Sequence, residues 1–65
     1  MILKVNSNPN FTLTLKLDID YEIEAINILV ILQNTKNGKK EMHCYHGSEF
    51  KKALMRYRQY EEFIF

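Results

Sequence analysis

The residues best suited to chemistry form one short run, His43-Cys44-Tyr45-His46. Histidine and cysteine ligate zinc, and a cysteine beside a histidine can act as a thiolate nucleophile. On a β-strand, however, Cys44 and His46 share one face while His43 lies on the other. A closed zinc site needs four ligands, and the chain has no second Cys/His cluster. We therefore expect no metal and no catalytic residue here, with Met42 and Cys44 packed under a helix and His43 and Tyr45 facing outward.

Motifs of the common enzyme classes are also absent from the sequence. It contains no phosphate-binding loop, no dinucleotide fingerprint, no nucleophile elbow and no pair of catalytic carboxylates. A chain of 65 residues also leaves little room for a substrate pocket of ordinary size. We expect a protein that is not an enzyme and that binds no cofactor.

Four carboxylates alternate with apolar residues in the first half of the chain, at Asp18, Asp20, Glu22 and Glu24. In an extended strand these side chains form one row of like charges, about 7 Å apart. Such a row either solvates a sheet edge or meets a basic groove of another protein. It is our first candidate partner-binding surface.

A second candidate partner-binding surface is the aromatic C-terminal end, formed by Tyr60, Phe63 and Phe65. Aromatic side chains are enriched at protein–protein interfaces, where they supply much of the binding energy.

Nucleic-acid binding is the alternative function, because the second half of the chain is basic although the net charge is only +1. Its candidate residues are Lys39, Lys40, Lys51, Lys52, Arg56 and Arg58. The segment NGKKEMHCYHGSEFKKALMRY is similar to the closing half of the plant ethylene-response DNA-binding domain and to the N-terminal domains of some integrases. Those families bind DNA through an exposed sheet face that carries Arg and Trp. This chain has no Trp, and both of its arginines fall in the expected helix.

The hydrophobic pattern predicts several antiparallel strands. Apolar and polar residues alternate over residues 11–19, and the alternation changes phase before Ile26, so we expect a turn or bulge near residues 18–24. Asn37-Gly38 predicts a type I′ hairpin that leads to a strand over roughly residues 39–46. A helix over residues 21–33 is the competing interpretation, but β-branched residues favour a strand there.

A C-terminal helix completes the expected fold. Ser48 is a candidate N-cap, and Phe50, Ala53 and Tyr57 follow helical spacing to about residue 62, before an apolar tail that should fold back. We expect a single α+β domain over residues 1–65, with a three- to four-stranded antiparallel meander and one amphipathic helix packed on one face.

The segment INILVILQ, residues 26–33, predicts a strand that is apolar on both faces. Leu29 and Ile31 face away from Ile28 and Val30, and one helix covers only one face of a sheet. Leaving two such side chains in water forgoes roughly 1.5–3 kcal/mol each. Either the two ends of the chain wrap around this face or another chain covers it, a second copy in a homodimer or a different protein.

We expect a cytoplasmic protein without a membrane segment. The N-terminus lacks the pattern of a signal peptide, and the longest apolar run is far shorter than the roughly 20 residues of a membrane-spanning helix. The single cysteine cannot form an internal disulfide, which is typical of a reducing compartment.

The order of elements carries a further resemblance. A Thr-rich strand (FTLTLKL), an Asn-Gly hairpin and a helix with an acidic end resemble small phage anti-defence inhibitors, such as anti-CRISPR proteins. The resemblance implies a viral protein in the host cytoplasm that inhibits a host nuclease or defence effector stoichiometrically by occluding its surface. A dimer that sequesters a nucleotide signal is a third interpretation.

Overall fold

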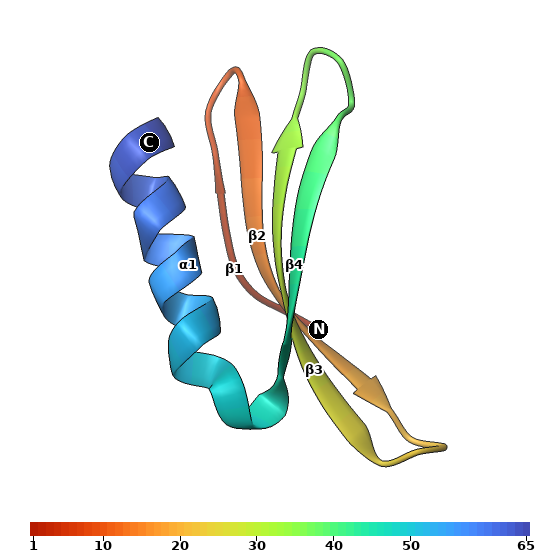
Figure 1. The fold of residues 1–65 in the computed structure, drawn as a ribbon. Helices are drawn as coiled ribbons and strands as arrows, with labels where there is room; N and C mark the ends of the chain where they lie inside the picture. Colours follow the sequence, from red (N-terminus) through yellow and green to blue (C-terminus); the bar gives the residue numbers. More distant parts are fainter.

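The computed structural model describes all 65 residues as a four-stranded antiparallel sheet with one helix across one face (Figure 1). The elements are β1 (Ile2–Ser7), β2 (Phe11–Asp20), β3 (Ala25–Asn34), β4 (Lys40–His46), a 3-10 turn at Gly47–Glu49 and α1 (Phe50–Ile64). The strands lie in the order of the sequence. The expected α+β meander is confirmed, and β3 is a strand rather than a helix.

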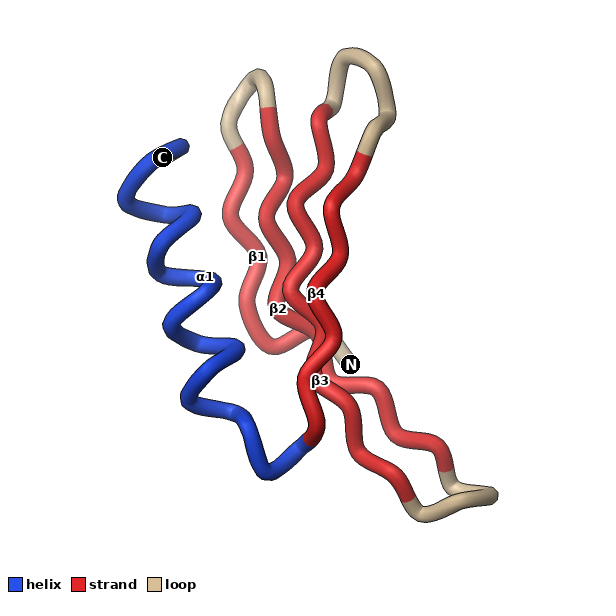
Figure 2. The backbone as a smooth tube through the Cα atoms, in the orientation of Figure 1, coloured by secondary structure: helices blue, strands red, loops and turns tan.

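The two central strands are longer than their neighbours. β2 and β3 have ten residues each, whereas β1 has six and β4 has seven. The pairing of β1 with β2 reaches Lys16, and the pairing of β4 with β3 reaches Asn27. Residues 18–26 therefore project beyond both edge strands as a two-stranded ribbon, which we call the arm (Figure 2). Its turn at residues 21–24 explains the change of phase in the sequence.

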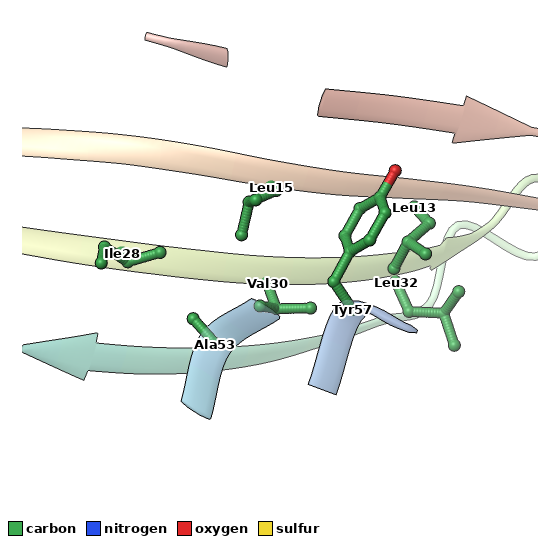
Figure 3. Close-up of a cluster of buried hydrophobic side chains, with 7 residues drawn as sticks. All are labelled: Leu13, Leu15, Ile28, Val30, Leu32, Ala53 and Tyr57. Carbon is green, nitrogen blue, oxygen red and sulfur yellow. The ribbon is translucent and has the colours of Figure 1, made fainter. Parts of the chain in front are cut away.

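The core lies between α1 and the two central strands (Figure 3). It consists of Leu13 and Leu15 from β2, Ile28, Val30 and Leu32 from β3, and Ala53 and Tyr57 from α1. The period-2 and i, i+4 spacings place these side chains on facing surfaces of the sheet and the helix. The small Ala53 lets α1 approach the sheet closely, and the ring of Tyr57 fills the space beside Leu13.

The loop between β3 and β4 differs from the predicted type I′ turn. That turn needs positive φ at two residues, but only Gly38 has it here, at 73°. Oδ1 of Asn34 accepts hydrogen bonds from the backbone N–H groups of Lys36 and Asn37, and the N–H of Gly38 donates to the Asn34 carbonyl. The side chain of Asn34 thus organises a wider loop, in which Gly38 alone takes the left-handed conformation.

Both ends of the helix also correct the sequence prediction. Ser48 is not the N-cap, because the side chain of His46 caps the preceding 3-10 turn and the His46 N–H donates a hydrogen bond to the carboxylate of Glu49. At the other end α1 runs to Ile64, so the apolar tail continues the helix instead of folding back. Ile64 packs against the core, whereas Phe63 is 84% exposed.

Candidate functional site

The His-Cys-Tyr-His run lies on β4 with the reverse of the expected orientation. His43 pairs with Val30 and Cys44 with Leu29, so His43 lies on the helix side of the sheet. Met42 is 52% exposed on the opposite side, where Cys44 also lies. The expectation that Met42 and Cys44 pack under the helix is wrong. No group of three or more His, Cys, Asp or Glu side chains is arranged to hold a metal ion.

A hydrogen-bond network joins β4 to α1. The Tyr60 hydroxyl donates to Oε2 of Glu41 at 2.8 Å, and Nε2 of His43 lies 2.9 Å from the same hydroxyl. Because Tyr60 has one hydroxyl proton, Nε2 of His43 is the donor in the second bond. Burial and the hydrogen bond to Glu41 raise the pKa of Tyr60. Nε of Arg56 donates to the Tyr45 hydroxyl at 3.2 Å, so the network fixes the helix against the edge strand.

The four acidic residues gather at the arm, but they do not form one strand row. Asp18 and Asp20 belong to β2, whereas Glu22 and Glu24 lie in the turn. Oδ1 of Asp20 accepts a hydrogen bond from the Glu22 N–H at 3.0 Å. Glu24 has a positive φ of 52°, a conformation that costs a non-glycine residue about 1 kcal/mol or more. All four carboxylates are exposed, so the arm is strongly acidic.

The arm also carries large apolar side chains that the sequence analysis did not select. Tyr21 is 83% and Ile23 is 71% exposed in the turn. Ile19 pairs with Ile26 on the helix side of the sheet, but both are exposed because α1 does not extend over the arm (Figure 1). In the sequence, apolar and charged residues continue to alternate through residues 18–24. This alternation was the signal that apolar side chains occur here, beyond the part of the sheet that the helix covers.

A hollow of about 400 Å³ lies at the base of the arm. Its lining residues are Met1, Leu17, Asp18, Ile19 and Tyr21. The N-terminal ammonium group donates to the Leu17 carbonyl at 2.7 Å, which ends the pairing of the first strand with β2 at this point. The hollow therefore combines apolar walls with one carboxylate.

The aromatic end lies at the opposite end of the molecule from the arm (Figure 1). Tyr60 is half-buried in the network with β4, and Phe63 and Phe65 are exposed beside it. Asn8, in the turn between β1 and β2, donates a side-chain hydrogen bond to the Ile64 carbonyl at 3.2 Å. The two candidate partner-binding surfaces are therefore separate and lie at opposite ends of the molecule.

The basic residues of the nucleic-acid alternative are divided between the loop that precedes β4 and the helix α1. Lys39 and Lys40 lie at the loop between β3 and β4, whereas Lys51 and Lys52 lie in the first turn of α1. Lys52 is paired with a glutamate of the preceding 3-10 turn at 3.1 Å, and Arg56 is bound to a tyrosine of β4. Arg58 is exposed on α1. The two lysines beside the loop and the four cations of α1 therefore lie on different elements.

The side of the sheet away from α1, which we call the outer face, has no cover. Two neighbouring rows cross all four strands: one consists of Val5, Thr14, Ile31 and Met42, and the next consists of Ile2, Lys16, Leu29 and Cys44. The first strand lies in the plane of the sheet and the C-terminal residues belong to α1, so neither end wraps around this face. The structure confirms that Leu29 and Ile31 face away from the core.

Comparison with known proteins found no matching protein-family model, no matching curated protein and no matching solved structure. Helix α1 is too short and too polar to cross a membrane.

Proposed function

We propose that this protein is a small protein-binding module that inhibits a nucleic-acid-processing protein, such as a nuclease of a host defence system, by occupying its surface. The observation that carries the proposal is the arm. It projects from the domain with four large apolar side chains exposed, those of Ile19, Tyr21, Ile23 and Ile26.

The apolar residues of the arm are suited to a protein interface. Full burial of one isoleucine side chain stabilises a complex by roughly 1.5–3 kcal/mol. Tyrosine is among the residues that most often dominate interface energetics. A two-stranded ribbon is only marginally stable alone in water, so a partner that covers the arm also stabilises it.

The charge of the arm defines the kind of partner. Its four carboxylates favour a basic surface, and complementary charge accelerates association and orients the partners. Basic grooves are the surfaces with which proteins bind phosphates of nucleic acids. An acidic ribbon in such a groove competes directly with DNA or RNA. Occupation of the groove is then sufficient to inhibit the partner protein.

The resemblance to phage anti-defence inhibitors makes an RNA-guided DNA nuclease the first partner to test. The nuclease, loaded with its guide RNA, is mixed with increasing amounts of the protein before target DNA is added. We expect cleavage to disappear near a ratio of one copy, or one dimer, to each nuclease.

Substitutions in the arm make this experiment specific. We expect Tyr21→Ser combined with Ile23→Ser to weaken inhibition at least tenfold, because both side chains are exposed and available to a partner. The matched control is Met55→Ser combined with Phe50→Ser, which removes two exposed apolar side chains from α1 outside both candidate partner-binding surfaces and should leave inhibition unchanged.

Affinity capture extends the test to other nucleic-acid-processing proteins. Wild-type protein, the arm variant and the control variant are each immobilised, and bound proteins are eluted with DNA. We expect a basic protein that the wild type and the control retain and the arm variant loses. The absence of any such arm-dependent partner that DNA displaces contradicts the proposal.

A further inference from the structure

We propose that the outer face binds a second copy of this chain, so that two sheets stack in a two-fold symmetric dimer. This inference is independent of the partner that the arm contacts. It rests on the distribution of apolar and charged side chains across a face that no other part of the chain covers.

The two central rows of the outer face are apolar except for Thr14 and Lys16, and the two ends of the face carry opposite charges. Ile31 and Leu29 are half-buried at its centre, with Val5 and Met42 exposed at its edges. Asp18, on this face because it pairs with Asn27, lies toward the arm. At the other end the outer face carries Lys40, which pairs with Gln33, next to the lysines of the β3–β4 loop.

This arrangement is complementary to itself. A two-fold axis in the plane of the interface and perpendicular to the strands stacks each strand on the same strand of the other copy. The end that carries Asp18 on β2 then lies over the end that carries Lys40 on β4, with these two charges two strands apart. The same patch then serves both copies, as a closed two-fold interface requires. A different protein would need an apolar surface whose basic end lies opposite the acidic end of this face. A second copy of the chain provides such a surface by symmetry.

The axis fits best between the two central rows. Leu29 of each copy then lies opposite Ile31 of the other, and Cys44 lies opposite Met42. Lys16 faces Thr14 of the second copy, so the two copies of Lys16 do not oppose each other. Stacked sheets of this kind are separated by about 10 Å, with side chains interleaved between them.

The area of the face is sufficient for a dimer. Four strands at a spacing of about 4.8 Å span about 19 Å, and the four rows that overlap around this axis, at about 7 Å each, span about 28 Å. Each copy therefore contributes about 500 Å², and the pair contributes about 1,000 Å² before the pleat adds surface. That value reaches the lower limit for a specific protein–protein interface, of about 1,000 Å².

Sedimentation equilibrium of matched variants tests the proposal. We expect wild-type protein to be a dimer at micromolar concentration. Met42→Lys places a charge in the interface and should give a monomer, with an unchanged circular dichroism spectrum. Met55→Lys is the matched control, since Met55 is 60% exposed on α1, and it should remain dimeric. A monomeric wild type at 100 µM, or a dimer that only Met55→Lys disrupts, overturns the proposal.

A third variant separates face stacking from pairing of two β4 edges. This variant is Thr14→Lys, because Thr14 lies at the centre of the outer face on β2, two strands away from β4. Stacked sheets are disrupted by Thr14→Lys as well as by Met42→Lys. A dimer that survives Thr14→Lys but not Met42→Lys is joined through its edges and contradicts stacking.

The single cysteine provides a direct measure of the geometry. Cys44 lies in a central row of the outer face and is exposed in one copy. In the proposed dimer the two thiols are about 9 Å apart, too far for a disulfide but within reach of a short bis-maleimide. We expect cross-linking of the wild type and of Met55→Lys, and loss of cross-linking in Thr14→Lys. Equal cross-linking of Thr14→Lys overturns the proposal.

Discussion

The hydroxyl of Tyr60 lies 2.8 Å from Oε2 of Glu41 and ties the last turns of α1 to the start of the edge strand β4. The same hydroxyl contacts His43, whose ring centroid lies 6.0 Å from that of Tyr60. These contacts hold the helix over one end of the sheet, while the arm at the other end has no helix over it (Figure 1).

Removal of this hydroxyl should destabilise the fold slightly. We expect Tyr60→Phe to lower the free energy of unfolding by about 0.5–1.5 kcal/mol, because Glu41 and His43 lose a shared partner. Urea denaturation followed by circular dichroism measures the change. Tyr21→Phe is the control, since Tyr21 is in the exposed turn of the arm, and it should have the stability of the wild type. Equal stability of the Tyr60→Phe variant and the wild type would show that the hydrogen bonds of the Tyr60 hydroxyl contribute nothing to stability.

Stability should fall at alkaline pH. Burial raises the pKa of both Tyr57 and Tyr60 above the ordinary value of 10.0, with further contributions from Glu61 and Glu41 respectively. The unfolded chain therefore loses these protons before the folded chain does. Their stabilising contribution is complete below pH 10 and is lost as pH rises through the raised pKa values.

Thermal unfolding between pH 8 and pH 11.5, a range chosen to span the ordinary tyrosine pKa of about 10, measures this dependence. Tyr60→Phe should reduce the slope above pH 10, because one of the two groups no longer titrates. Tyr21→Phe should keep the slope of the wild type. An identical slope in all three proteins would contradict this assignment.

The loop between β3 and β4 depends on the left-handed conformation of Gly38. No atom lies within 4 Å of the position of an added Cβ, so the cost of a substitution is conformational and not steric. We expect Gly38→Ala to lower the free energy of unfolding by about 1 kcal/mol, since its φ is 73°. Gly38→Asn should cost less, because asparagine tolerates this conformation. Equal losses measured by urea denaturation would argue against this explanation.

Two isoleucines on the same face of β3 distinguish the core from the arm. Ile28 is buried under α1, whereas Ile26, two residues earlier, is exposed in the arm. Ile28→Ala should cost about 2–5 kcal/mol because it leaves a cavity. Ile26→Ala should cost about 1 kcal/mol or less. Chemical denaturation of the two variants compares them, and similar losses would mean that the arm is packed in solution.

The sequence by itself determined the elements. Strict alternation specified β2, the β-branched residues specified β3, and the four-residue spacing of Ala53 and Tyr57 specified the buried side of α1. These signals are local, because each depends on the period of one element. The loop after β3 was predicted less accurately, because the side chain of Asn34 stabilises a wider turn than Asn37-Gly38 indicates.

The tertiary structure alone decided which faces are covered and where charge gathers. Alternation showed that Met42 and His43 lie on opposite faces of β4, but only the register that pairs His43 with Val30 placed His43 under the helix. The acidic residues were evident in the sequence, yet their projection on an arm follows from how far the edge strands pair with β2 and β3. The end of a strand pairing is set by contacts between distant segments, and a single segment does not encode it.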